Sequence, residues 1–264
     1  MRSPDVAPAL VACLSLAVPV FAQTRPLQTE EAATARAGTL VLELGADAMR
    51  GEPNFLTGRA RDRFDLPELR LVYSPSANVE LDLEWVGRVF ARDDPDFGSV
   101  SDFGDVSLRA KVRFAEEGNG RPALGARFGV TLPQTSYGNG LGPNTLRFAA
   151  QLLLSQRLGG LVVHANAGLA IQDEAQRPHE QRDFLAYGLA VERALGGSLE
   201  VVAELAGLAG SGMPGTDARA EARGGLRYGR DRLRLDAAVR RGLAEADGTW
   251  GLTAGLAWRL REGR

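Results

Sequence analysis

The sequence predicts an all-β protein, a transmembrane antiparallel up-and-down β-barrel of about twelve strands. Three observations predict this fold class. An apolar run typical of export opens the chain, segments of roughly ten to thirteen residues then alternate apolar with polar side chains, and the breaks between them alternate between short and long. Successive side chains of a strand leave opposite faces of a sheet, and a tilted strand needs about nine to eleven residues to cross a bilayer.

Residues 1–22 predict a signal peptide. Arg2 precedes the apolar run VAPALVACLSLAVPVFA (6–22), and Val20 and Ala22 form a small-residue cleavage site, so we expect the mature chain to begin at Gln23. Two alternatives are weaker. An amphipathic or transmembrane start is disfavoured because prolines break the run, and lipidation at Cys13 is disfavoured because the run continues past it.

Residues 23–36, QTRPLQTEEAATAR, are polar and lack a strand pattern. We expect them to form a periplasmic lead-in, and residues 37–264 to form the barrel.

Six alternating segments make up the first half of the predicted barrel. VELDLEW (79–85) alternates apolar residues with three carboxylates, and DVSLRAKVRF (105–114) alternates apolar residues with three basic ones. Both patterns have the period of two that a strand with one apolar face requires. The other four segments are LVLEL (40–44), LRLVY (69–73), LGARFGVTL (124–132) and LRFAAQLLL (146–154).

The second half gives six more segments with the same alternation. They are LVVHANAGLAI (161–171), LAYGLAV (185–191), LEVVAEL (199–205), ARAEARGGLRY (218–228), LRLDAAV (233–239) and LTAGLAWRL (252–260). Short breaks fall near 74–78, 115–122, 158–160, 195–197 and 229–231, and longer ones near 47–60, 91–102, 133–144, 172–182, 208–217 and 242–248. This rhythm is typical of tight periplasmic turns and longer external loops.

The apolar faces are predicted to meet lipid. A soluble β-sandwich also alternates, but its strands average only about five or six residues. The polar faces then line the lumen, either as a structural ladder of paired charges or as a selectivity lining. The predicted lumen residues are Glu80, Asp82, Glu84, Arg88, Asp105, Arg109, Lys111, Arg113, Arg127, Arg147, His164, Asn166, Arg234 and Arg240.

Charge pairing also predicts a register for two neighbouring strands, 78–90 and 102–114. If paired residue numbers sum to 193, Glu84 lies opposite Arg109 and Glu80 lies opposite Arg113. A shift by one residue would turn charges toward lipid, whereas a shift by two would keep the faces and change only the pairing.

Composition points away from several functional classes. The formal net charge is -2 and no block of like charge stands out, so we expect no nucleic-acid partner. No Cys/His cluster offers a metal site, and no cofactor is expected. His164 and Asn166 are similar to part of the active site of outer-membrane phospholipases, but no serine stands two residues after His164. We therefore expect no enzymatic activity.

The chain resembles a family of outer-membrane proteins that are grouped with the meta-pathway of phenol degradation and predicted to be transporters. The resemblance rests on SDFGDVSLRAKVRF (101–114), LPQTSYGNGLGPNTLRFAAQLLLSQRLGGLVVHANAGLAI (132–171) and TWGLTAGLAWRL (249–260). It implies a twelve-stranded barrel in the outer membrane of a Gram-negative bacterium, and it favours small hydrophobic or aromatic compounds as substrates.

From these observations we expect a monomeric channel for passive uptake or efflux of small molecules. Its partners would be outer-membrane lipid, a small-molecule solute and the outer-membrane assembly machinery. Two alternatives stay open: a structural or interaction barrel with a closed lumen, and, less favoured, a barrel enzyme of the phospholipase type.

Overall fold

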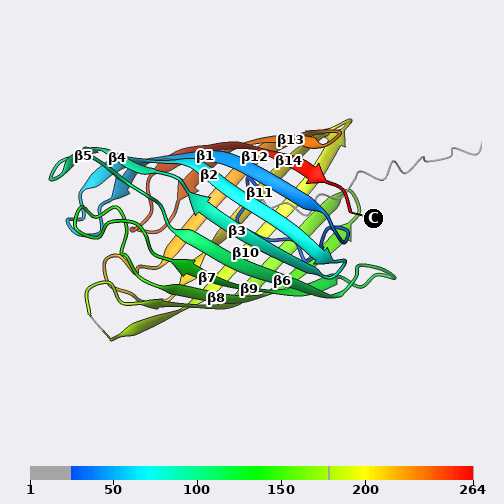
Figure 1. The fold of residues 1–264 in the computed structure, drawn as a ribbon, viewed down its shortest axis with the longest axis horizontal. Helices are drawn as coiled ribbons and strands as arrows, with labels where there is room; N and C mark the ends of the chain where they lie inside the picture. Colours follow the sequence, from blue (N-terminus) through cyan, green and yellow to red (C-terminus); the bar gives the residue numbers. More distant parts are fainter. Residues whose placement is uncertain (1–24, 178, 264) are drawn as a thin grey trace, which may run out of the picture.

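The protein folds as a closed barrel of twelve antiparallel strands with up-and-down connectivity (Figure 1). This is a computed structural model, and it describes residues 25–177 and 179–263. The predicted signal peptide and its cleavage site lie outside the described residues. The fold class predicted from the sequence is confirmed.

Fourteen strands are distinguished in the described chain, because two wall strands are each interrupted. β4 and β5 form a hairpin that extends β3 and β6 beyond the barrel, and pairing of β1 with β2 and with β14 closes the wall. The strands are β1 (Leu40–Pro53), β2 (Ala60–Ser76), β3 (Val79–Val86), β4 (Val89–Asp94), β5 (Gly98–Asp102), β6 (Val106–Ala115), β7 (Ala123–Leu132), β8 (Arg147–Leu158), β9 (Leu161–Asp173), β10 (Gln181–Gly196), β11 (Leu199–Ala209), β12 (Arg219–Arg230), β13 (Leu233–Gly242) and β14 (Trp250–Arg261).

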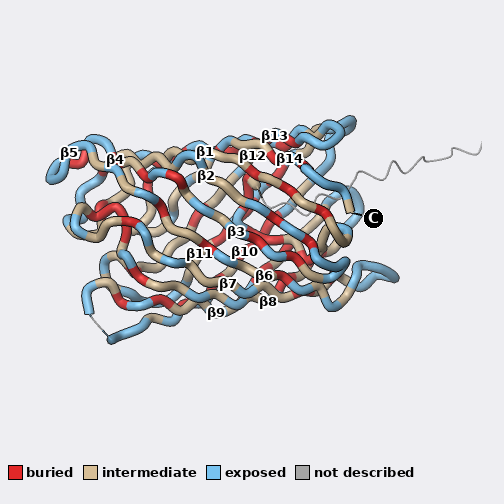
Figure 2. Tube along the Cα trace, viewed as in Figure 1, coloured by how far each residue is buried: buried red, intermediate tan, exposed pale blue. Residues whose placement is uncertain are grey.

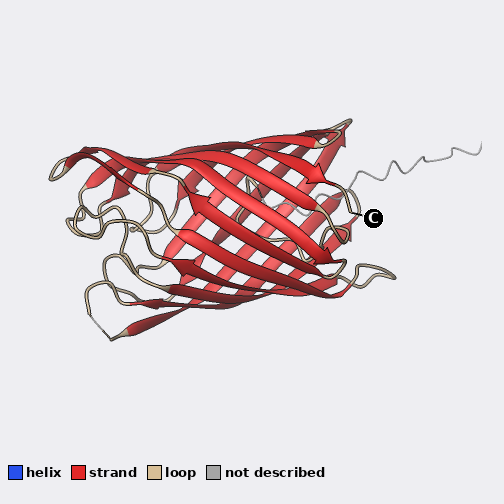
Figure 3. Cartoon of the chain, viewed as in Figure 1, coloured by secondary structure: helices blue, strands red, loops and turns tan. Residues whose placement is uncertain are grey.

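Strands make up the whole wall, and the loops gather at its two ends (Figure 3). The end near the C-terminus carries mostly tight turns, and the opposite end carries the longer loops together with the β4–β5 hairpin. None of the described residues forms a helix long and apolar enough to cross a membrane.

Burial alternates along the strands, as Figure 2 shows. Large apolar side chains such as Phe114, Leu152 and Leu252 are exposed on the outside, while charged residues such as Lys111 and Glu43 are buried within. An outer surface this apolar suits lipid and would be costly in water.

The register of β3 and β6 differs from the predicted one by two residues. Asp82 pairs with Arg109 and Glu80 pairs with Lys111, so the paired numbers sum to 191. The predicted register is wrong, although it placed each side chain on the correct face. Charge pairing discriminates only weakly between the predicted and the observed register. Each pair contributes only about 0.2–1 kcal/mol, and an arginine can also reach a carboxylate diagonally opposite it. Arg109 does so, binding Glu84 at 2.5 Å and Asp82 at 3.3 Å.

The predicted periplasmic lead-in lies inside the barrel instead. In the described part of the segment, residues 25–36, Leu27, Thr29, Glu30 and Ala32 are all at most 5% exposed. Leu27 packs on Ala190 and Val202, and Ala32 packs on Ala123 and Leu153. The segment carries no strand pattern because its partners are inward side chains of the wall and not a neighbouring strand.

Candidate functional site

Inward side chains of the barrel hold the backbone of residues 25–36. The Glu204 carboxylate accepts the N–H groups of Gln28 and Thr29, each at 2.8 Å. Asn166 binds Glu30 twice, accepting its N–H at 2.7 Å and donating to its carbonyl at 2.8 Å. Because buried backbone groups need partners, these contacts replace the water that the segment loses in the lumen.

Further bonds continue along the segment. The Ala32 N–H donates to Ser155 Oγ at 2.8 Å, and the Ala35 N–H donates to Glu80 at 2.6 Å. We call residues 25–36 the plug, since they occupy the lumen on the short-turn side of the barrel.

Two charged side chains of the plug enter the ionic network of the wall. The buried Glu30 carboxylate lies 2.9 Å from Arg70, 3.1 Å from Arg127 and 3.6 Å from Lys111. Arg25 donates to Glu68 at 2.5 Å and to the Thr253 hydroxyl at 3.0 Å. The plug therefore adds one carboxylate and one guanidinium group to the ionic network of the wall, in which Arg70 and Lys111 also pair with wall carboxylates.

Ser155, His164 and Glu192 form a row across β8, β9 and β10. The Ser155 hydroxyl lies 2.7 Å from His164 Nδ1, and His164 Nε2 lies 3.6 Å from Glu192. Serine, histidine and a carboxylate are also the residue types of a hydrolase triad. Ser155 comes from the strand next to that of His164, so the spacing of residues along the sequence could not reveal this contact. Here the hydroxyl accepts the Ala32 N–H while it also hydrogen-bonds His164 Nδ1, so the plug backbone occupies one face of the serine oxygen. The row thus anchors the plug.

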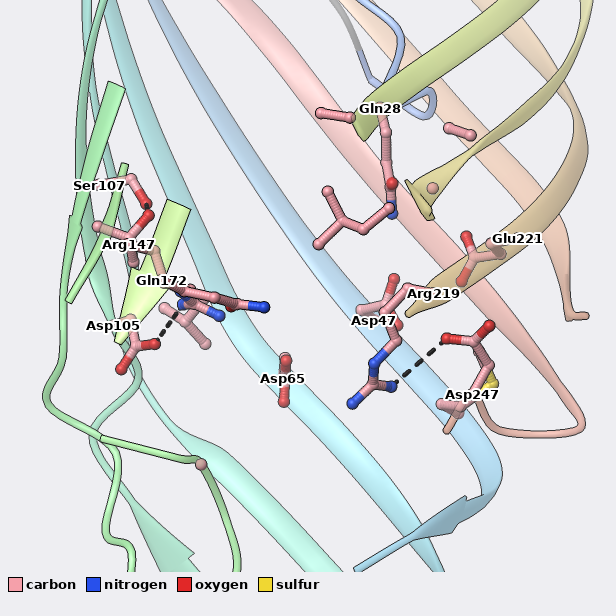
Figure 4. Close-up of a pocket in the computed structure, with 18 of the residues that line it drawn as sticks. Gln28, Asp47, Asp65, Asp105, Ser107, Arg147, Gln172, Arg219, Glu221 and Asp247 are labelled. Atoms are coloured by element: carbon pink, nitrogen blue, oxygen red, sulfur yellow. Dashed lines mark hydrogen bonds and ion pairs between the residues drawn. The ribbon is translucent and has the colours of Figure 1, made fainter. Parts of the chain in front are cut away.

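A polar chamber of about 640 Å³ lies between the plug and the outer loops (Figure 4). In Figure 4, Asp105 and Arg147 lie on one side, while Asp47, Arg219 and Asp247 lie on the other. Nine carboxylates and five guanidinium groups line this chamber. They are Asp47, Glu52, Asp65, Glu68, Glu84, Asp105, Asp217, Glu221 and Asp247, with Arg63, Arg109, Arg147, Arg219 and Arg240.

Most of these charges are paired across the chamber wall. Arg147 binds Asp105 at 2.6 Å, Arg63 binds Asp65 at 2.9 Å, and Arg109 binds Glu84. A second cavity of about 410 Å³ continues from the chamber toward the plug and shares part of its lining. The arrangement can admit a small solute with polar groups as far as the plug.

The loop at 133–146 folds inward over the chamber. Leu141 is 1% exposed and packs on Val89 and Ala91, and it lines the chamber together with the adjacent Gly142 and Pro143.

Arg61 and Asp94 hold this loop in place. Arg61 donates to Asp94 at 3.0 Å and to the carbonyls of Asn139 and Gly140. Burial opposes ionisation of Asp94, but hydrogen bonds from Asn54, from two backbone N–H groups and from Arg61 outweigh it and hold the pKa of this carboxyl below its usual range.

A second anchor joins two other outer loops. Glu174 accepts hydrogen bonds from Thr216 at 2.8 Å and from Arg182 at 2.9 Å. Burial opposes ionisation of Glu174, but these two bonds hold the pKa of its carboxyl below its usual range.

Of the fourteen predicted lumen residues, the structure places twelve inside the barrel. Six of these line the chamber, and the other six contact the plug or a side chain that binds it. The twelve are Glu80, Asp82, Glu84, Asp105, Arg109, Lys111, Arg127, Arg147, His164, Asn166, Arg234 and Arg240. Arg113 lies at the short-turn end, where it donates to Asn78 and to the Ala77 carbonyl.

Arg88 lies on the outer face, in contrast to the prediction. Val86 and Val89 both face the chamber, so the break between β3 and β4 reverses the alternation and turns Arg88 outward. The reversal occurs at Gly87, whose N–H donates to the Pro67 carbonyl at 2.8 Å and where a Cβ would lie 2.9 Å from Pro67 Cδ.

The prediction from the sequence did not include several other charged residues of the lumen and the plug. Glu43, Arg70 and Glu204 point inward and follow the alternation used for the other strands, so the same rule would have found them. Arg25 and Glu30 belong to the plug, where no periodicity marks them.

Solved structures with a similar fold are bacterial membrane barrels. The translocator domain of the autotransporter NalP from Neisseria meningitidis aligns with a TM-score of 0.53 at 12% identity, covering 84% of this chain and 89% of that one. The β domain of the Bordetella autotransporter BrkA aligns with a TM-score of 0.51 at 15% identity, covering 84% of this chain and 99% of that one. These likenesses concern the fold. The comparison with curated proteins finds no match.

A family model also matches most of the chain. Its description is "Putative MetA-pathway of phenol degradation", and the match spans residues 57–260, from the turn before β2 into the last residues of β14. The chain belongs to this family of outer-membrane β-barrels.

Proposed function

We propose that this protein lets small molecules diffuse through the outer membrane by way of its lumen, and that the plug limits their passage. The observation that carries the proposal is the polar chamber of about 640 Å³ that ends on the plug. The long loops would face the outside of the cell and the short turns the periplasm, as in other outer-membrane barrels.

The chamber lining favours solutes that carry polar groups. The family description names phenol degradation, which makes hydroxylated aromatic compounds candidates, and such compounds combine a small ring with hydrogen-bonding groups. A pure hydrocarbon would find few apolar partners among the fourteen charged residues of the lining.

Displacement of the plug would leave the strands of the wall paired. The plug lies outside the strand pairings of the sheet, so its loss removes side-chain contacts and leaves the ladder of the barrel intact. Twelve tilted strands about 4.8 Å apart give a backbone radius of roughly 12 Å, so an emptied lumen would be a water-filled passage narrowed by its side chains.

Single-channel recording in planar bilayers tests the proposal. We expect small conductance steps from the wild type, and larger steps from a variant lacking residues 25–36 and from Glu204→Ala, which removes the partner of two plug amides. Glu200→Ala is the matched control, because Glu200 lies on the same face of β11 and accepts neither of these two plug amides. If correctly folded protein without the plug conducts no ions, the lumen is closed and the interaction-barrel alternative holds.

A further inference from the structure

Four arginines lie on the outer face of the barrel near the long-loop rim. Arg50 is on β1, Arg88 precedes β4, Arg92 is on β4 and Arg241 is on β13, and all four are exposed. They are unusual among the strand arginines, most of which point into the lumen and bind carboxylates there.

Three of these arginines form one row across five neighbouring strands. Arg241 and Arg50 are both register partners of Trp250 on β14. Asp62 on β2 lies 3.6 Å from Arg50 and is the register partner of Arg92. With strands about 4.8 Å apart, the row is roughly 19 Å wide.

Aromatic side chains place this row at the depth of the lipid headgroups. The Arg88 guanidinium lies 4.5 Å from the ring centre of Phe103, and Arg50 lies 5.9 Å from that of Trp250. Arg92 lies 5.5 Å from the ring of Phe64. Aromatic residues on the outer face of a barrel gather at the membrane interface, so cations beside them meet headgroups.

Three of these four cations have no ion-pair partner within the described chain, and the fourth keeps most of its surface exposed. No carboxylate there forms an ion pair with Arg88, Arg92 or Arg241, and Arg50 remains 65% exposed beside Asp62. The same rim on the β9–β10 side carries the outward, exposed carboxylates Asp173 and Asp183. On the outer face at this rim, arginines therefore outnumber the single carboxylate Asp62 in the row, and carboxylates stand on the β9–β10 side.

We infer that Arg50, Arg88, Arg92 and Arg241 form a binding site for the phosphate groups of lipid A in the outer leaflet. Several guanidinium groups can share one phosphate through charge-assisted hydrogen bonds, which a single cation cannot match. The acyl chains would lie on the apolar surface below, beside Phe90 and Leu252. The inference rests on the orientation given under the proposed function, with long loops outside.

Binding of purified lipid A to the detergent-solubilised protein, followed by native mass spectrometry, tests the site. The variant carries Arg50→Gln, Arg88→Gln, Arg92→Gln and Arg241→Gln, and Arg193→Gln is the control because Arg193 is an outward, exposed arginine at the opposite end of β10. We expect at least a tenfold loss of lipid A binding in the fourfold variant and none in the control. Wild type should also prefer bisphosphorylated over monophosphoryl lipid A.

Two results would overturn the inference: equal binding by the fourfold variant and the wild type, or equal binding of phosphatidylglycerol and lipid A by the wild type. The heat-dependent gel shift of folded barrels confirms folding, and if the fourfold variant does not fold, Arg50→Gln with Arg241→Gln is used in its place. The site is outside the lumen, so conductance should not change, and this keeps a failure here separate from a failure of the proposed function.

Discussion

At the scale of single residues, Glu30 links the plug to the wall. Its carboxylate faces Arg70, Arg127 and Lys111, which come from β2, β7 and β6. Lys111, the only lysine in the sequence, also binds Glu80 at 2.6 Å. Hydrogen bonds to charged groups contribute more than neutral ones, about 1.5–3 kcal/mol each, so one carboxylate can decide whether the plug stays bound.

We predict that Glu30→Gln increases the rate of thiol labelling in the plug at least tenfold, because a neutral amide cannot balance the charge of three surrounding cations. Thiol labelling of Ala32→Cys in a Cys13→Ser background measures it, since Ala32 is fully buried in the bound plug. Labelling should be slow with Glu30 present and fast in Glu30→Gln. Glu31→Gln is the comparison: the Glu31 carboxylate forms no ion pair with these three cations in the described chain, and Lys111 reaches only the Glu31 backbone carbonyl, at 3.4 Å, which the substitution keeps. Equal labelling rates would contradict the role given to Glu30.

A second residue-scale prediction concerns Ser155. Ser155→Ala removes the acceptor of the Ala32 N–H and leaves His164 without its hydroxyl partner, so the plug should loosen by about 1–3 kcal/mol. The same labelling assay checks it, and Ser107→Ala is the control because Ser107 bonds Thr131 away from the plug. If the row were a hydrolase site, Ser155→Ala would instead abolish ester hydrolysis that wild type shows.

Residue patterns predicted the lumen side of the strands well and failed where the alternation is interrupted. Asp105, Lys111 and Asn166 sit inside because their strands keep the period of two throughout. Arg88 was misplaced because a break at Gly87 reverses the parity, and that break depends on contact with Pro67 in another strand. The plug could not be predicted at all, because its contacts join residues far apart in the sequence.

At the scale of elements, the outer loops are fixed by a few ionised carboxylates. Asp94 joins the β4–β5 hairpin to Arg61, while Arg61 also binds the loop before β8. Glu174 joins the β9–β10 loop to Thr216 in the loop before β12. Together with apolar contacts such as Leu141 on Val89 and Ala91, these bonds fix how the chamber is covered.

We predict that the outer loops open in acid. The pKa values of Asp94 and Glu174 are lowered in the folded protein, so their stabilisation is complete above the ordinary pKa of about 4 and is lost as the pH falls through the folded values. Limited proteolysis of the loops with an acid-active protease should be slow at pH 5 and fast near pH 2.5. Asp94→Asn and Glu174→Gln should be cut quickly at both values. Loops equally protected at both pH values would show that these carboxylates do not hold them.

At the scale of the whole molecule, the sequence specifies the two faces of the barrel more strongly than the alignment of its strands. A one-residue shift would place an arginine against lipid at a cost of about 2–4 kcal/mol near the midplane, whereas the two-residue difference between β3 and β6 costs little. The wall therefore has an apolar outer face and a charged inner face. Near the plug, carboxylates and guanidinium groups of the inner face are equal in number. In the outer chamber they are not, because carboxylates outnumber guanidinium groups by nine to five.

This excess predicts that the passage prefers cations. A lumen lined by more negative than positive groups raises the local concentration of cations and lowers that of anions, and the low-dielectric wall strengthens the effect. With a potassium chloride gradient across a planar bilayer, the reversal potential of the plug-free variant should have the sign of a cation-selective pore. Asp65→Asn together with Asp217→Asn removes two negative charges from the chamber and should shift the potential toward zero. Asp173→Asn with Asp183→Asn removes the same charge from the outer rim and should shift it little. The idea fails if the channel selects anions, or if both pairs of substitutions shift the potential equally, since the lining of the chamber would then not control selectivity.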